Sequence, residues 1–101
     1  IGRQTGVRIC SFGHAGDGNL HIYACRDDME ENAWKAACEQ VMDELYAAAR
    51  EMGGEVSGEH GIGHAKRDFL GESVGEVQMN LMRGIKAAFD PNGILNPGKV
   101  V

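Results

Sequence analysis

The segment Gly6–Cys25, GVRICSFGHAGDGNLHIYAC, contains two short runs of apolar and small residues on either side of a glycine-rich centre. Gly6–Gly13 and Leu20–Cys25 are each predicted to form a β-strand, because β-branched and aromatic residues are frequent in both. The dipeptide Asp17-Gly18 lies between them and favours a two-residue type I′ turn. The segment therefore predicts a β-hairpin.

The position of the turn predicts which residues of the two strands face each other. With Asp17 and Gly18 as the two turn residues, His14 is expected directly opposite His21. The Cβ atoms of such cross-strand partners are about 4.5–5.5 Å apart. The hairpin therefore predicts two imidazoles side by side on one face. The same register pairs further residues on that face: Phe12 with Tyr23, and Cys10 with Cys25.

Two long helices are predicted after the hairpin. Asp28–Met52 carries apolar residues at a spacing close to 3.6, begins with a pattern that resembles a capping box, and is followed by two glycines. Ser73–Phe89 has a similar apolar stripe and begins with Ser73 and Glu76, the S-x-x-E pattern of a capped helix. Shorter features are a brief strand at Glu55–Ser57, a loop at Gly58–Gly63, a short helix at His64–Leu70 and a turn at Asp90–Gly93.

The predicted order of elements indicates an α+β fold, with an antiparallel hairpin and two main helices packed on one of its faces. Two strands alone are only marginally stable in water. The hairpin is therefore expected to belong to a larger sheet, and the isolated fragment is expected to self-associate to complete it.

Composition excludes several classes of protein. The chain has 101 residues, a formal net charge of -5 and no cluster of Lys or Arg, so no nucleic-acid partner is expected. No apolar run reaches the roughly 18 residues that a membrane-spanning helix needs. The three cysteines form no CxxC pair, and their odd number suggests reduced thiols and a cytoplasmic location.

The histidines and one glutamate form the candidate site. His14 and His21 supply two nitrogen ligands, and Glu59 in a second glycine-rich segment supplies an oxygen ligand. Two histidines with one carboxylate form a typical catalytic transition-metal set. His60 follows Glu59 and is then available as a general base. The spacing of these residues does not exclude the alternative that the histidines are hydrogen-bonded structural residues.

Three motifs resemble one family when they are taken together. They are GHAGDGNLH at Gly13–His21, SGEHGIG at Ser57–Gly63 and FDPNGILNPGK at Phe89–Lys99. In this order they resemble the C-terminal region of the FAD-linked oxidases. This group includes the glycolate oxidase D subunit, cytochrome-linked D-lactate dehydrogenases and D-2-hydroxyglutarate dehydrogenase, and its flavin fold is that of the vanillyl-alcohol oxidase superfamily.

The resemblance implies roles for particular residues. The positions of His14, His21 and Glu59 bind a divalent metal, usually zinc, and His60 lies by the flavin and acts as the base. Asn96 and Lys99 belong to the tail that returns toward the flavin and the substrate. The implied reaction is oxidation of a D-2-hydroxy acid, of the glycolate or D-lactate type, to the 2-oxo acid by metal-assisted hydride transfer to FAD.

The resemblance also implies what this chain contains. Residues 1–101 correspond to the end of a ferredoxin-like substrate (cap) domain and the C-terminal tail, whereas the domain that binds most of the FAD is absent. The isolated fragment is therefore expected to be inactive. Redox partners implied for the parent enzyme are a partner subunit or an electron-transfer chain, with membrane association through such partners left open.

One position departs from the family pattern. Tyr23 stands two residues after His21, where an Asn that contacts substrate is expected in the hydroxyglutarate enzymes. Tyr23 is expected on the histidine face and is assigned to the substrate pocket. This disfavours a dicarboxylate substrate and favours glycolate, lactate or a similar acid.

Two other kinds of function remain as alternatives. A metal-dependent hydrolase would use the same ligands to activate water, but it does not explain the tail motif. A small metal-binding or assembly module without redox activity of its own would also fit the size of the chain.

Overall fold

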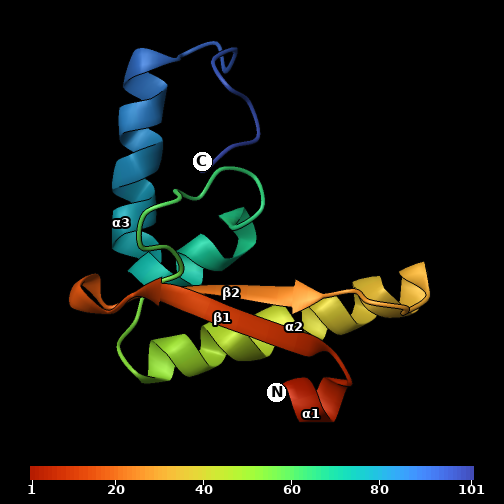
Figure 1. Cartoon of the computed structure of the whole chain (residues 1–101). Coiled ribbons are helices and arrows are strands. Elements are labelled where there is room, and N and C mark those ends of the chain that lie inside the picture. The colour runs from red at the N-terminus through yellow and green to blue at the C-terminus, as the bar shows by residue number, and fades with distance from the viewer. The chain divides into compact units, whose positions relative to one another are not determined.

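A computed structural model describes all 101 residues, and the chain divides into two compact units, Ile1–Gly54 and Glu55–Val101 (Figure 1). The α+β fold class predicted from the sequence is confirmed. No helix has a stretch that is both long and apolar enough to cross a bilayer. The first unit contains α1 (Gly2–Thr5), β1 (Arg8–His14), the 3-10 turn η1 (Ala15–Asp17), β2 (Asn19–Cys25) and α2 (Glu31–Glu51), and the second contains α3 (Arg67–Phe89).

The predicted hairpin is confirmed, but the predicted type of turn is wrong. β1 and β2 pair antiparallel with His14 opposite Asn19 and with Phe12 opposite His21, two residues away from the predicted register. The strands are joined by η1 and Gly18 rather than by a two-residue turn. A type I′ turn needs positive φ at both central residues, and here only Gly18 takes a positive φ, of 65°. Asp17 instead lies in the 3-10 turn.

The long helix of the first unit is confirmed with a different cap. α2 begins at Glu31, and its N-cap is Glu30, whose carboxylate accepts hydrogen bonds from the backbone N–H groups of Asn32 and Ala33 at 2.8 and 3.2 Å. The predicted capping box of Asp28 and Glu31 is therefore wrong. These bonds satisfy two of the N–H groups that a helix N-terminus leaves unpaired. Gly53, at φ 77°, follows the end of the helix as predicted.

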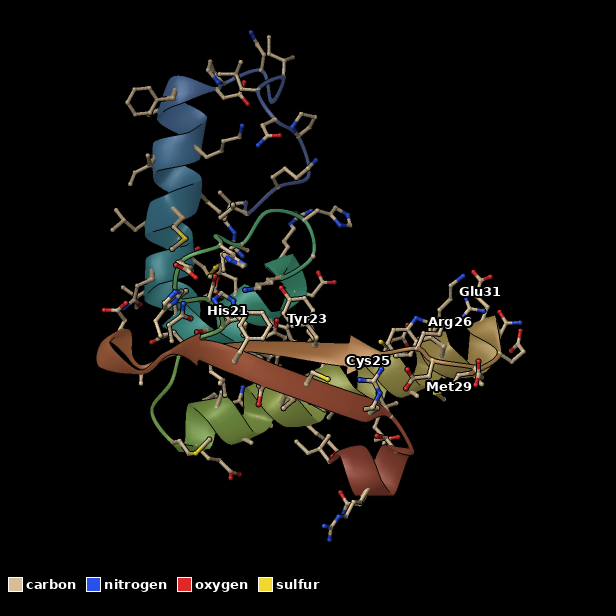
Figure 2. All side chains as sticks on the ribbon, viewed as in Figure 1. His21, Tyr23, Cys25, Arg26, Met29 and Glu31 are labelled. Carbon is tan, nitrogen blue, oxygen red and sulfur yellow. The ribbon has the colours of Figure 1, made fainter.

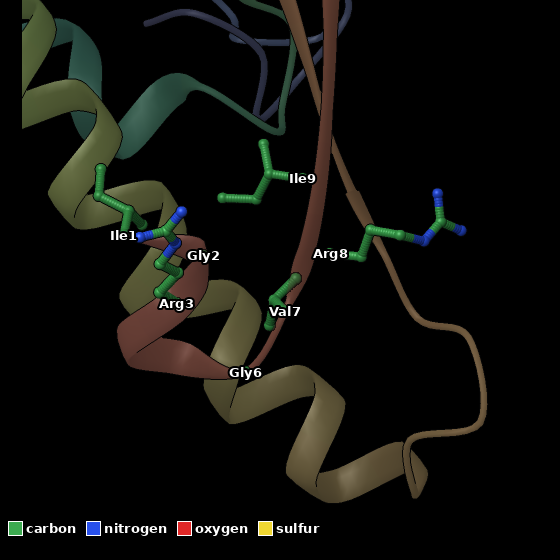
Figure 3. Close-up of a pocket in the computed structure, with 7 residues that line it drawn as sticks. All are labelled: Ile1, Gly2, Arg3, Gly6, Val7, Arg8 and Ile9. Atoms are coloured by element: carbon green, nitrogen blue, oxygen red, sulfur yellow. The ribbon is translucent and has the colours of Figure 1, made fainter.

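Two valines form the best-buried part of the first unit. Val41, in the middle of α2, is completely buried, and Val7, just before β1, is nearly so. The short helix α1, which the sequence did not predict, contacts both α2 and β1. Residues of α1 and the start of β1 surround an open hollow of about 620 Å³ (Figure 3). Its lining consists of glycines and apolar residues with two arginines, Arg3 and Arg8, and contains no carboxylate, histidine or cysteine that could act with them.

The second unit is organised around α3, which is interrupted at Gly75. Gly75 has φ 81° and ψ 165°, so the helical backbone breaks there. The predicted S-x-x-E cap is wrong, because the Ser73 hydroxyl instead donates to the Glu55 carboxylate and accepts the N–H of Val56 at 3.3 Å. The predicted strand at Glu55–Ser57 is also wrong. Hydrogen bonds to the side chain of Ser73 in α3, rather than a partner strand, hold this segment.

A buried carboxylate holds the turn after α3. Asp90 is only 6% exposed and accepts hydrogen bonds from the backbone N–H groups of Ile94 and Leu95 at 2.9 and 3.0 Å. The Lys86 ammonium also donates to Asp90, at 2.5 Å, and to the carbonyl of Leu95. The hydrogen bond from Lys86, supported by the two backbone N–H groups, lowers the pKa of Asp90 below its usual 3.8.

We expect Asp90→Ala to loosen this turn. Hydrogen exchange at the amides of Ile94 and Leu95 should accelerate by about tenfold in the intact protein, because both amides lose their acceptor. Because the folded-state pKa is lowered, the stabilisation is complete above the ordinary carboxyl pKa and is lost as the pH falls through the folded value. Exchange corrected for its intrinsic pH dependence should therefore accelerate in acid. Asp43→Asn, at an exposed carboxylate of α2, should change neither amide.

Candidate metal centre and catalytic loop

One face of the hairpin carries two histidines, two cysteines and a tyrosine. Side chains alternate between the two faces of a strand, and the observed register places alternate residues of β1 and β2 on a common face. Figure 2 shows His21, Tyr23 and Cys25 following one another along β2. We call this the histidine face, and its members are Arg8, Cys10, Phe12, His14, Asn19, His21, Tyr23 and Cys25.

His14 and His21 lie close together on the histidine face. Their ring centroids are 5.7 Å apart, and the ring planes meet edge to face at 80°. They are diagonal rather than direct neighbours, because the register differs by two residues from the prediction. A shift of two residues keeps every side chain on its original face, whereas a shift of one would have separated the histidines. The predicted neighbourhood is therefore confirmed although the predicted pairing is wrong.

Two histidines at this separation are a suitable start for a metal site. His14 is exposed and His21 is half-buried, so solvent reaches the pair. Imidazole nitrogens bind zinc and other transition metals at about 2.0–2.1 Å, and two rings in contact can direct one nitrogen each to a common ion. The donor set of the hairpin therefore fits half of a typical catalytic metal site.

Phe12, which was predicted on the histidine face without a role at the site, contacts His21. The Phe12 ring lies 5.4 Å from the His21 ring and stacks on Tyr23, also at 5.4 Å and with an interplanar angle of 10°. Phe12 is 60% exposed and Tyr23 is 50% exposed. One ring is thus packed against both His21 and Tyr23. The available signal was the alternation of Phe12 with His14, which marks one face of a strand.

The second unit carries the predicted carboxylate and base in one exposed loop. The Nε2 atom of His60 lies 3.7 Å from the Oε1 atom of Glu59. The loop is braced by Ser57, whose hydroxyl donates to the Gly61 carbonyl at 3.3 Å and accepts from the Lys66 ammonium at 3.1 Å. The loop is thus held from both ends. Glu59 belongs to a different unit from the two histidines, so its role as the third ligand stays a prediction.

The tail residues Asn96 and Lys99 belong to the same unit as this loop. The Val100 N–H donates to the Gly63 carbonyl at 2.9 Å, which joins the tail to the end of the loop. Asn96 has a φ of 46°, and the Lys99 ammonium donates to the Pro97 carbonyl at 3.0 Å. An ammonium has three donors, so Lys99 keeps capacity for an anion. The substrate and cofactor roles of both residues stay predictions.

Comparisons with known proteins show the family to which the chain belongs. Residues 1–100 match the family model described as FAD linked oxidases, C-terminal domain. The chain is 62% identical over 97 residues to a D-lactate dehydrogenase of Anaerostipes hadrus, and the aligned region covers 96% of this chain and 20% of that protein. It is 42% identical over 100 residues to glycolate oxidase subunit GlcD of Bacillus subtilis, covering 99% of this chain and 21% of that protein.

A third relative widens the range of named substrates. The chain is 41% identical over 93 residues to a D-2-hydroxyglutarate dehydrogenase of Stutzerimonas stutzeri, covering 91% of this chain and 20% of that protein. The chain thus spans about a fifth of the length of these curated relatives. Because the family model covers nearly every residue, the chain belongs to the FAD-linked oxidases and corresponds to their C-terminal domain.

Proposed function

We propose that this chain is the C-terminal part of a longer flavoenzyme that oxidises a D-2-hydroxy acid, such as D-lactate or glycolate, to the 2-oxo acid with FAD as the hydride acceptor. The observation that carries the proposal is the contact between His14 and His21 on the histidine face. The names of the relatives support the class of substrate. The domain that binds most of the FAD would lie outside these residues.

The proposed metal ligands are His14, His21 and Glu59. Two imidazoles and one carboxylate leave coordination positions open, as catalytic zinc sites do. A divalent metal held there, with zinc as the proposed ion, would polarise the 2-hydroxyl and the carboxylate of the substrate. The side chains of Phe12 and Tyr23 would hold the ring of His21 in place. Holding the ring in one orientation would favour metal binding, because a mobile imidazole loses rotamer entropy when it binds an ion.

The proposed general base is His60. It lies next to Glu59 on a braced loop, so a substrate bound near Glu59 would be within reach of its imidazole. His60 would take the proton of the 2-hydroxyl as the C2–H bond is broken. FAD carries the redox chemistry in enzymes of this type, and the protein supplies position and proton transfer. His60 and Asn96 are the proposed contacts of this chain with the flavin.

The proposed substrate contacts are Tyr23, Asn96 and Lys99. The Lys99 ammonium would attract the carboxylate of the substrate, and Asn96 would supply an amide for hydrogen bonding. Tyr23 would form a wall beside the metal ligands, because it shares the histidine face with His21 and is held by Phe12. A fixed aromatic wall favours a short acid over one with a second carboxylate.

Replacing Tyr23 is expected to change the choice of substrate. Tyr23→Asn removes the stacked ring and should raise KM for D-lactate by about 10-fold while improving the relative kcat/KM for D-2-hydroxyglutarate. Tyr23→Phe is the matched control, because it keeps the ring and removes only the hydroxyl. Steady-state kinetics with both acids will measure the change. An unaltered ratio of the two kcat/KM values would remove Tyr23 from the pocket.

The proposed reaction is tested by bleaching of the flavin in the intact protein. Anaerobic mixing with D-lactate, glycolate, D-2-hydroxyglutarate and the L isomers should reduce the flavin with the D-2-hydroxy acids or glycolate only, and metal analysis should find one divalent ion per chain. Flavin reduction without any metal would remove the metal from the proposal. A protein with neither flavin nor metal would instead support an assembly module without redox activity.

The proposal includes partners and location. We propose a small 2-hydroxy acid as substrate, a redox subunit or an electron-transfer chain as acceptor from FAD, no nucleic acid, and a cytoplasmic enzyme that reaches membranes through its partners. Both outer edges of the β1–β2 hairpin lack a partner strand, which supports completion of the sheet by further chain or by a second copy.

A further inference from the structure

Two cysteines lie in contact at the end of the hairpin that is far from the turn. The Sγ atoms of Cys10 and Cys25 are 3.8 Å apart. Both thiols are free, Cys10 is exposed and Cys25 is half-buried. They lie on the histidine face, four residues along their strands from His14 and His21 respectively. This pair takes no part in the function proposed above.

The Cys10 sulfur receives hydrogen bonds from two directions. The Arg8 Nη1 atom donates to it at 3.2 Å, and the Cys25 thiol donates to it at 3.8 Å. Arg8 is itself held by Asp27, through Nε to Oδ2 at 2.9 Å and Nη2 to Oδ1 at 2.5 Å. Cys10 is therefore the sulfur of the pair that accepts both hydrogen bonds, one of them from a cation.

Cys25 is suited to the opposite role. Its partly desolvated position raises its thiol pKa, and the hydrogen bond to Cys10 adds to this effect. Cys25 therefore keeps its proton and remains the donor, while Cys10 is the acceptor. A two-step oxidation needs one sulfur that attacks the oxidant and a neighbouring thiol that then displaces the product, and the hydrogen bonds assign the first role to Cys10 and the second to Cys25.

We propose that Cys10 and Cys25 form a peroxide-reactive dithiol that closes to a reversible disulfide. The Cys10 thiolate attacks one oxygen of hydrogen peroxide, the O–O bond breaks, and Cys10 sulfenic acid and hydroxide form. Cys25 then attacks the sulfenic sulfur as its thiol proton is lost, and water leaves as the S–S bond forms. The two thiols lose two electrons in total, and hydrogen peroxide is reduced to water.

The short distance between the sulfurs favours this product over further oxidation. A second thiol can capture a sulfenic acid as a disulfide. Without such a thiol, the sulfenic acid oxidises further to sulfinic acid, which thiols do not reduce. The Cys25 sulfur starts 3.8 Å away and must approach to about 2.05 Å. Cys25 is the last residue of β2, so the ladder does not continue beyond it and this end can adjust.

The guanidinium of Arg8 argues against a metal at the same pair. A cation bound by the two sulfurs would stand beside the positive charge that lies 3.2 Å from Cys10. The same guanidinium already donates a hydrogen bond to Cys10, which a metal ion on this sulfur would have to displace. The same charge stabilises a thiolate, so the arrangement favours attack by sulfur over binding of a cation.

Mass spectrometry of the intact protein tests the proposal. After brief exposure to a small excess of hydrogen peroxide, the peptides that contain Cys10 and Cys25 should be found linked, with the loss of two hydrogens, and dithiothreitol should restore both. Cys38 is the internal control, because partial burial on α2 raises the pKa of its thiol. Cys38 should remain reduced under conditions that link the pair.

Three variants separate the roles. Cys25→Ser should stop the reaction at Cys10 sulfenic acid, trapped by dimedone, and then give sulfinic acid. Cys10→Ser should leave Cys25 reduced. Arg8→Gln should slow the oxidation of Cys10 by about tenfold, because the thiolate loses its charged donor. The circular dichroism of each variant should match the parent. Oxidation of Cys38 before the pair, or sulfinic acid on Cys10 with Cys25 present, would overturn the proposal.

Discussion

Replacing His60 with alanine in the intact protein is expected to lower kcat for D-lactate by about 10²- to 10⁴-fold, the range that a general acid–base group contributes. The reason is that the 2-hydroxyl proton would lose its acceptor while the substrate still binds through other groups. The rate of flavin reduction under anaerobic, single-turnover conditions measures the step directly. KM should change much less than kcat, because the loss falls on the transition state.

A neighbouring histidine provides the matched control for this experiment. His64 is exposed and lies four residues after His60, directly after Gly63. His64→Ala should retain kcat, so a loss confined to His60→Ala cannot be explained by a general effect on the segment. Added imidazole should restore part of the activity of His60→Ala. If His60→Ala retains full single-turnover flavin reduction, the base lies elsewhere in the enzyme.

Replacing both His14 and His21 with alanine should remove the metal. The two histidines supply two of the three proposed ligands. Loss of a residue that only supports a ligand lowers metal affinity by up to about 100-fold, so loss of two ligands should lower it further. Metal analysis after gel filtration measures the effect, and flavin reduction should be lost with the metal. The flavin absorbance should persist, since the FAD-binding domain is proposed to lie elsewhere.

The third ligand is tested separately with Glu59→Gln. This change keeps the size of the side chain but removes the carboxylate charge, so the metal should be weakened or lost. His64→Ala again provides the control, because it removes one imidazole without touching the proposed set. Metal retained at the parent level in Glu59→Gln would reject Glu59 as a ligand. Metal retained in the double histidine variant would reject the site.

Much of the local structure follows from the sequence. The β-branched and aromatic residues of Gly6–Cys25 predict the hairpin, and the stripe within Asp28–Met52 predicts α2, because these patterns reflect which side each residue turns to the interior. The turn predicted from the sequence, although its register is two residues out, also predicts that His14 and His21 share a face, because a shift of two keeps each side chain on its face. The three family motifs identify the C-terminal domain of the FAD-linked oxidases, because they consist of particular residues in a particular order, whereas the spacing of apolar residues predicts only secondary structure.

Local patterns fail where several segments compete for the same polar group. Ser73 matches a capping signal, yet its hydroxyl bonds to Glu55 and to the backbone of Val56, and the helix breaks at Gly75 instead. Glu30 rather than Asp28 caps α2. A capping pattern describes only residues near in sequence, whereas the partner of Ser73 comes from 17 or 18 positions away.

The sequence by itself determined the strands, the long helices, the face shared by the histidines and the family, because these depend on residue type and on spacing along the chain. Only the tertiary structure decided the register of the hairpin, the burial of Asp90 with its two backbone N–H donors, and the hydrogen bond from Arg8 to the Cys10 sulfur. The register depends on the backbone path of the hairpin turn, because Asp17 lies in η1 rather than in a left-handed conformation and every cross-strand partner moves with it. The bonds of Asp90 depend on how the chain folds back after α3.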